Sequence, residues 1–167
     1  MASVRAYTRA DYDQVARLFR QLSQTHRGLY CLPAVGSRYP DRWFHKHLRK
    51  YGSKSLRVAE DRGRVVGLVG LIPHRGRGEI EPFVVAARCR RRGIGRLLIQ
   101  AATQEARRRR WRSLTAGIAP RNDVALWSFH SLGFRTLVSM DLEMRLPGPV
   151  RFPSRPGPRI AGRRFQS

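Results

Sequence analysis

Two carboxylates separated by one residue are the side chains of this sequence best suited to acid–base chemistry. Glu79 and Glu81 lie in the segment 79–86, whose composition predicts a β-strand. Residues two positions apart on a strand point to the same face, so the two carboxylates are expected to lie side by side. A carboxylate placed there can take a proton from an ammonium group and so make an amine nucleophilic. The competing interpretation is that either glutamate pairs with the many arginines of the chain.

A glycine-containing turn directly after this strand has the features of an anion-binding site. Arg90-x-x-Gly93-x-Gly95 stands between the predicted strand and a helix expected over about residues 96–110. The N–H groups at the start of a helix have no partner within it and carry the positive end of its dipole, so they attract phosphates. Glycine also lets a phosphate approach the backbone closely. The sequence therefore predicts a pyrophosphate-binding loop.

The spacing in this loop differs from that of the common nucleotide loops, since neither Gly-x-x-x-x-Gly-Lys nor Gly-x-Gly-x-x-Gly is present. It resembles the (Gln/Arg)-x-x-Gly-x-(Gly/Ala) pyrophosphate loop of the GNAT acyltransferases. Downstream, Asn122-x-x-Ala125-x-x-x-Phe129-x-x-x-Gly133-Phe134 resembles the second signature of that family. The segment Glu79–Val85 is similar to its catalytic strand. The resemblance covers roughly residues 3–146.

The resemblance implies an N-acetyltransferase in which a primary amine attacks the thioester of acetyl-CoA directly, without a metal. Backbone N–H groups from Arg91 to Arg96 would hold the pyrophosphate, and backbone groups from Phe83 to Val85 would hold the pantetheine arm. Glu79 or Glu81 would be the general base, directly or through water. The residues expected to contact acetyl-CoA are Phe83, Val84, Val85, Arg90, Arg91, Arg92, Gly93, Ile94, Gly95, Arg96, Asn122 and Phe129.

The chain departs from the family at Phe129, where many members place a tyrosine that protonates the leaving thiolate. Phenylalanine cannot donate a proton. The thiolate would then leave unaided or with water, or Ser128 or His130 would supply the proton. A further interpretation is a protein that binds acyl-CoA without turning it over.

The order of the predicted elements is β-α-α-β-β-β-α-β-α-β. It indicates a mixed α/β fold, a GNAT-like sheet of six to seven strands with about four helices on both faces. The sheet is expected to splay at the cofactor-binding strand, where Pro82 suits a bulge or an open ladder. The expected strands cover 3–7, 56–60, 65–72, 79–86, 113–119 and one or two within 134–146. The expected helices begin at Thr8, Pro40, Arg96 and Asp123, and loops are expected over 23–39 and 73–78.

Apolar residues at helical spacing predict the buried faces of the helices. The first helix would bury Val15, Leu18, Phe19 and Leu22, and the second Trp43, Phe44, His47, Leu48 and Tyr51. The helix over 96–110 would bury Leu97, Leu98, Ala101 and Ala102. Residues 1–146 are expected to form the acyltransferase domain. Residues 147–167 hold five prolines, five arginines and no acid, which predicts a disordered basic tail.

The charge is the most unusual feature of the composition. The chain has 34 basic and 11 acidic residues, a net charge of +23, and 31 of the basic residues are arginine. Such a field concentrates polyanions. A nucleic-acid- or ribosome-associated binding protein is therefore the alternative class, although the Arg107–Arg110 run also suits a helix C-terminus. Among acceptors, acidic or neutral amines or a protein N-terminus are favoured over polycationic amines.

Other classes find little support in the sequence. The two cysteines, Cys31 and Cys89, indicate neither a disulfide framework nor a metal site. His45 and His47 stand at a spacing that points them to different helix faces. With no long apolar run and no signal-like N-terminus, a soluble cytoplasmic protein is expected, either a monomer or a homodimer.

Overall fold

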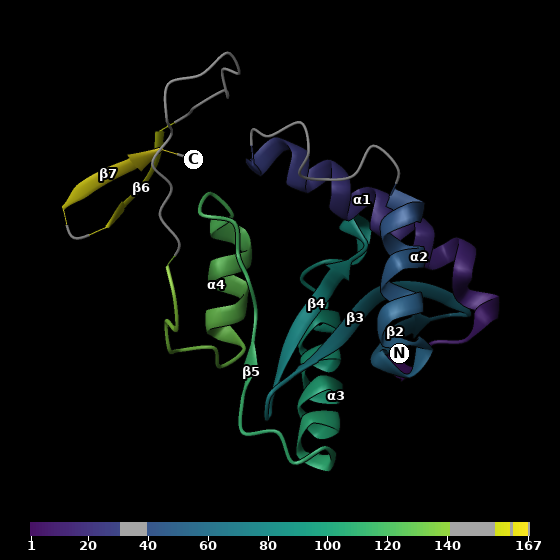
Figure 1. Cartoon of the computed structure of the whole chain (residues 1–167). Helices are drawn as coiled ribbons and strands as arrows, with labels where there is room; N and C mark the ends of the chain where they lie inside the picture. Colours follow the sequence, from purple (N-terminus) through teal and green to yellow (C-terminus); the bar gives the residue numbers. More distant parts are fainter. Residues whose placement is uncertain (31–39, 141–155, 161, 167) are drawn as a thin grey trace.

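A five-stranded mixed sheet forms the centre of the computed structural model, which describes residues 1–30, 40–140, 156–160 and 162–166 (Figure 1). The strands lie side by side in chain order: β1 (Ser3–Ala6), β2 (Leu56–Asp61), β3 (Arg64–His74), β4 (Arg77–Val85) and β5 (Leu114–Thr115). The first four are antiparallel, and β5 joins β4 in parallel.

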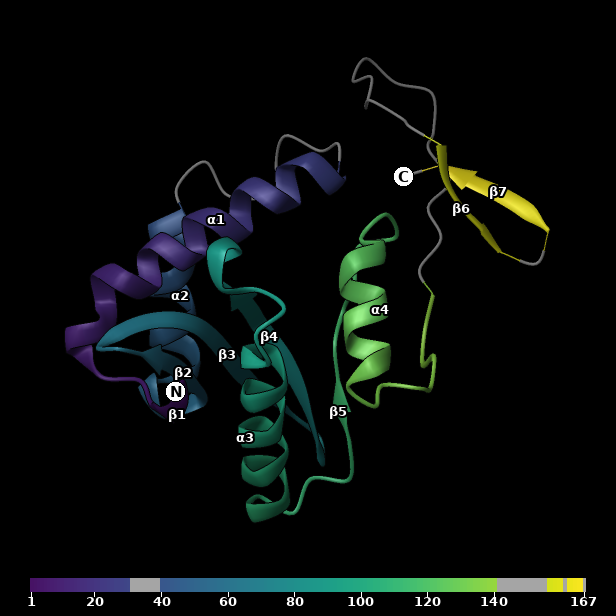
Figure 2. The same cartoon turned by 180° about the vertical axis from the view of Figure 1, so that it is seen from behind.

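Helices cover both faces of this sheet. α1 (Tyr12–Tyr30) and α2 (Pro40–Tyr51) bury Val15, Phe19 and Phe44 in one apolar core. α3 (Ile94–Arg108) and α4 (Asp123–Ser131) contribute Leu98 and Phe129 to a second core on the opposite face. Figure 2 shows α3 in front of the sheet and α4 beside it. The predicted mixed sheet with helices on both faces is confirmed.

The first helix starts and packs as predicted but is longer. Thr8 and Asp11 form a capping box ahead of α1, and Val15, Leu18 and Phe19 are buried. α1 continues to Tyr30, so the loop expected from residue 23 is wrong for residues 23–30; the rest of it, 31–39, lies outside the described residues. The polar side chains after Leu22 do not break a helix, and the Thr25 hydroxyl donates to the Gln21 carbonyl within it.

Both hairpins of the sheet turn on residues with positive φ. The β2–β3 turn uses Arg62 (51°) and Gly63 (72°), as the sequence predicted. The β3–β4 turn is tighter than the loop expected over 73–78, because Pro73 pairs with Gly78 and His74 with Arg77. That correction lengthens both strands.

α3 begins two residues earlier than predicted, and the set of side chains that it buries differs in part from the prediction. Ile94, Leu98, Ile99, Ala102, Glu105 and Ala106 are buried. Leu97 and Ala101, expected on that face, are only half-buried.

Fewer residues after α3 join the main sheet than the sequence predicted. Only Leu114 and Thr115 of the strand expected over 113–119 pair with β4. Residues 134–140 form no strand, because no partner strand lies beside them in the described part of the chain, and 141–146 lie outside it. Where a disordered tail was predicted, β6 (Pro156–Ile160) and β7 (Arg163–Gln166) form a hairpin apart from the main sheet (Figure 1). The domain boundary at residue 146 stays a prediction.

Candidate active site

A bulge in β4 sets the direction of the predicted catalytic side chains. Val69 pairs with Phe83 and Leu71 with Ile80, so Glu81 and Pro82 together oppose Gly70. A Cβ atom on Gly70 would collide with the Glu81 carbonyl and the Pro82 ring, so this close approach requires glycine. A proline is tolerated here because the bulge needs no ladder hydrogen bond from it. The bulge lies where Pro82 predicted one.

Glu79 and Glu81 lie on the same face of β4. Ile80, between them, packs into the core on the α3 side, so the two carboxylates point away from α3. Glu79 Oε2 is 2.8 Å from His74 Nε2. Neither glutamate pairs with an arginine among the residues that the structure describes, contrary to the competing interpretation.

The surroundings of Glu81 favour its protonated form. Burial raises the pKa of the Glu81 carboxyl above its ordinary value, and the nearby charge of Glu79 raises it further. A carboxylate with a raised pKa is a stronger base than an exposed one. Of the two candidates, Glu81 is therefore the better suited to accept a proton.

The loop between β4 and α3 presents a row of backbone donors. Arg91 (φ 60°) and Gly93 (φ 77°) turn the chain into the first residue of α3, Ile94. In the described part of the chain, the N–H groups from Arg91 to Arg96 donate to no backbone acceptor. A Cβ atom on Gly95 would lie 3.5 Å from Phe83 Cζ, so the first turn of α3 faces that side chain. Such an arrangement can bind a pyrophosphate.

The arginine side chains of this loop are exposed, whereas the side chain of Ile94 is buried. Arg90, Arg91, Arg92 and Arg96 are exposed, and Arg90 Nε donates to the Val85 carbonyl over 3.4 Å. Ile94 is buried in the core, so it can offer a ligand only its backbone N–H.

A residue that the sequence prediction missed holds the start of the loop. Gln21 of α1 donates from Nε2 to the Val85 carbonyl (3.1 Å) and accepts from the Ala87 N–H at Oε1 (2.9 Å). It thus fixes the end of β4 relative to α1. The available signal was a polar residue three positions after Leu18, at the border of the apolar face of α1.

The strands that flank the proposed cofactor position separate from each other. β5 pairs with β4 only at Gly78–Leu114 and Glu79–Thr115. Beyond these pairs, the edge of β4 from Ile80 to Val85 has no strand partner on the β5 side among the described residues. This is the predicted splay. Val84 packs into the α1–α2 core, whereas Phe83 and Val85 face α3.

The residues expected from the second signature have structural contacts. Asn122 caps α4, its Oδ1 accepting from the Ala125 N–H over 3.1 Å. Phe129 is 6% exposed, and its ring centroid lies 5.1 Å from those of Phe83 and Phe134. Phe129 therefore joins α4 to β4 beside the splay.

Neither polar neighbour of Phe129 takes the place of a tyrosine hydroxyl. Ser128 and His130 are exposed and, as adjacent helix residues, point away from the face that Phe129 buries. The Ser128 hydroxyl donates to the Val124 carbonyl over 2.6 Å. In this arrangement neither side chain lies at the splay.

The sequence matches the family model of the GNAT acetyltransferases over residues 15–134. The chain belongs to the GNAT family. Comparison with curated proteins finds no matching sequence. Three solved structures are similar to this chain over 79–87% of its length, and two of them contain CoA.

A ribosomal-protein-alanine N-acetyltransferase from Brucella melitensis is 26% identical, with 79% of this chain and 83% of that chain covered and a TM-score of 0.62. PaiA N-acetyltransferase from Thermoplasma acidophilum with CoA is 14% identical (84% and 93% covered, TM-score 0.67). An aminoglycoside N-acetyltransferase in complex with CoA is 17% identical (87% and 95% covered, TM-score 0.66). At such identities the last two show the shared fold.

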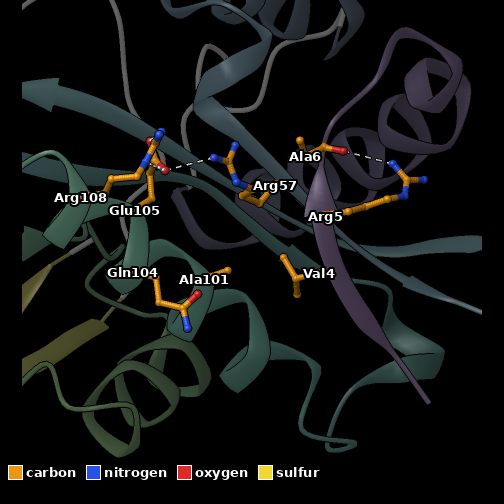
Figure 3. A pocket seen from close by; sticks show the side chains of 8 residues that line it. All are labelled: Val4, Arg5, Ala6, Arg57, Ala101, Gln104, Glu105 and Arg108. Carbon is orange, nitrogen blue, oxygen red and sulfur yellow. Dashed lines mark hydrogen bonds and ion pairs between the residues drawn. The ribbon is translucent and has the colours of Figure 1, made fainter.

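Within the described ranges, no three histidine, cysteine or acidic side chains gather as metal ligands, and no helix has the length and apolar character to cross a membrane. A hollow of about 340 Å³ lies between α3 and the strands β1 and β2, lined by Arg57, Glu105 and Arg108 among others (Figure 3). It contains none of the predicted site residues.

Proposed function

We propose that this protein is an N-acetyltransferase that transfers the acetyl group of acetyl-CoA to a primary amine. The observation that carries the proposal is the separation of β4 from β5 directly beside the open N-terminus of α3. Membership of the GNAT family supports it.

Two sets of backbone groups would hold acetyl-CoA. The N–H groups from Arg91 to Arg96 suit the pyrophosphate, with the exposed Arg90, Arg91, Arg92 and Arg96 adding charge. The open edge of β4 from Phe83 to Val85 suits the pantetheine arm, which would pair with it as a strand does. One N–H of this edge would polarise the thioester carbonyl. The role of Asn122 would be to fix α4 rather than to contact the cofactor.

Glu81 would remove the proton that the acceptor ammonium must lose, directly or through a water. The free amine nitrogen then bonds to the thioester carbon and the C–S bond breaks. As the amide forms, the nitrogen loses its second proton to water or to the departing thiolate. Phe129 gives this thiolate no proton. A thiol pKa of about 8.5 makes an unassisted or water-assisted departure acceptable.

The proposed acceptor is a protein N-terminus or another amine without further positive charge. A net charge of +23 repels polycationic amines. An α-amino group also has a pKa of about 7.7–8.0, against about 10.4 for lysine, so a carboxylate base can deprotonate it more easily. The similarity to a ribosomal-protein-alanine N-acetyltransferase points to the same class of acceptor.

Release of CoA thiol from acetyl-CoA tests this function. Peptides with a free N-terminal alanine or serine are compared with the same peptides blocked at the N-terminus, with spermidine and with an aminoglycoside. We expect release with the free peptides only. Binding of acetyl-CoA without release for any amine would contradict turnover and would favour a non-catalytic acyl-CoA-binding protein, for which Phe129 is the specific argument.

A further inference from the structure

Four arginines line a hollow beside the phosphate loop, here called the arginine pocket. Arg62 and Arg64 come from the β2–β3 turn, and Arg88 and Arg92 come from the loop between β4 and α3. The hollow measures about 480 Å³. Segments distant in sequence thus bring four guanidinium groups to one place.

The positive charge of this pocket is not neutralised by the fold. Asp61 is the one acid in its lining, and its Oδ1 lies 4.0 Å from the amino terminus of Met1. None of the four pocket arginines forms an ion pair with a described residue. Elsewhere in the fold, Arg5, Arg57 and Arg108 each bind a carboxylate. The pocket therefore attracts anions from solution.

The pocket lies on the opposite side of β4 from the splay. The sheet order places β3 and the β2–β3 turn on one side of β4 and β5 on the other. The turn is fixed by the pairing of Asp61 with Arg64 and by the positive φ of Arg62. A ligand in the β4–β5 splay that reaches the N-terminus of α3 leaves the turn arginines unoccupied.

The charge around the pocket exceeds what a single phosphate neutralises. Its lining holds four guanidinium groups and one carboxylate, that of Asp61. We propose that the arginine pocket binds the phosphodiester backbone of a nucleic-acid strand, with Arg62 and Arg64 outside the acetyl-CoA site and Arg92 at its border. Guanidinium groups bind phosphates through paired N–H donors, and successive phosphates match several arginines at once. This proposal stands independently of the acetyltransferase activity.

Binding of a fluorescein-labelled U12 oligoribonucleotide to the full chain, followed by anisotropy at increasing NaCl, tests the pocket. The test variant is Arg62→Gln with Arg64→Gln, which leaves the phosphate loop intact. The matched control is Arg75→Gln with Arg77→Gln, which removes the same charge from exposed positions at the β3–β4 turn, at the other end of the strands. Each variant is also titrated with CoA and with dephospho-CoA.

Four phosphate contacts predict that the wild-type protein loses about 50-fold in affinity for U12 between 50 and 200 mM salt, and that the test variant loses about 7-fold. The control variant should keep the slope of the wild type, and CoA binding should stay unchanged in both variants. If both variants bound U12 equally weakly, the loss of affinity would come from the net positive charge of the whole protein and not from the pocket. That result would overturn the proposal.

Two further results would also overturn it. If the test variant binds CoA more weakly but dephospho-CoA normally, the pocket holds the cofactor's 3′-phosphate. If polyglutamate of equal charge competes with U12 as well as unlabelled U12 does, the pocket has no preference for phosphates. Failure of the chain to bind acetyl-CoA would contradict only the proposed acetyltransferase function.

Discussion

Glu105 and Glu81 are carboxylates that the fold withdraws from solvent in opposite electrostatic settings. Glu105, on α3, accepts hydrogen bonds from Arg57 and Arg108 at 3.2 and 2.9 Å (Figure 3) and from Arg109 at 2.6 Å. The bonds from Arg108 and Arg109 outweigh burial and lower the pKa of Glu105 to about 2. Glu81, on β4, has no arginine partner among the described residues, and its pKa is raised.

This difference distinguishes a carboxylate that stabilises the fold through ion pairs from a carboxylate that is free to take part in chemistry. With 34 basic residues for 11 acids, arginine partners are abundant. A carboxylate without one must be kept from them by its place in the fold, as Glu81 is in the β4 bulge. The arginine pocket is the reverse case, since its four guanidinium groups form no ion pair with a described residue. We infer that charged side chains in ion pairs stabilise the fold, and that charged side chains outside ion pairs bind or react with ligands.

Replacing Glu81 by glutamine should have the largest effect on activity. Loss of a general base lowers kcat/KM by about 10²–10⁴-fold. Because the pKa of Glu81 is raised, the basic form is lost as pH falls through a value above the ordinary 4.5. The wild-type rate should therefore fall at acid pH with that apparent pKa, and the variant should lack this limb.

Glu79→Gln is the matched control, because it changes the neighbouring carboxylate on the same face. We expect a loss of less than about tenfold, since a group that only influences a neighbouring charge contributes less than the base itself. Equal losses for both variants, or an unchanged pH profile in Glu81→Gln, would remove the distinction between the two glutamates.

Glu105→Gln should change stability and leave the site intact. Three guanidinium groups would lose their charged acceptor, at a cost of about 2–3 kcal/mol. For a chain of this size the melting temperature would fall by about 5–10 °C. Asp13→Asn removes the same charge at an exposed position on α1 that forms no ion pair with a described residue, and it should shift the melting temperature much less.

The stability difference between the wild type and Glu105→Gln should depend on pH in a definite direction. The pKa of Glu105 is lowered in the folded state, so its contribution is present above the unfolded pKa and disappears as pH falls toward about 2. Thermal melts of both proteins should therefore converge at acid pH. A difference that grows on acidification, or weaker binding of acetyl-CoA by Glu105→Gln, would contradict the structural role.

Local patterns in the sequence predicted most of the elements around the site. The gap between the strands expected over 56–60 and 65–72 predicted the β2–β3 turn, Pro82 the bulge, and Gly93-x-Gly95 the start of α3 to within two residues, because each depends on neighbouring residues alone. The length of β5 could not be predicted, since a strand exists only where a partner lies beside it. The same dependence explains residues 134–140, whose apolar side chains suggested a strand.

The sequence did not show which side chains the charged residues in and near the site would contact. Glu79 and Glu81 look equivalent in sequence, and the structure distinguishes them by the burial of Glu81 and by the contact of Glu79 with His74. The basic run Arg107–Arg110 stands at the end of α3, as the sequence suggested. The sequence did not show that Arg108 and Arg109 also bind the buried Glu105 of the preceding turn. Which side chains contact each other depends on the packing of elements that are distant in sequence, and this packing cannot be read from a single sequence.

Phe129→Tyr should give the smallest effect. A thiolate with a pKa of about 8.5 leaves readily, so an added hydroxyl should change kcat by less than about tenfold. The new polar group would enter a position that is 6% exposed, between Phe83 and Phe134, and should lower stability slightly. A gain of about 100-fold in steady-state CoA release would instead show that the missing proton donor limits the enzyme.

The most direct test of the central claim is the thermal stability of the full chain with acetyl-CoA at moderate salt, with ATP and 3′,5′-ADP as polyanion controls. Saturation at about 100 times the dissociation constant adds about 2.7 kcal/mol. This corresponds to a rise of roughly 5–10 °C in melting temperature. Our account predicts that rise for acetyl-CoA, well above both controls. Equal shifts with all three ligands would contradict it, because the loop before α3 would then be only part of a basic surface.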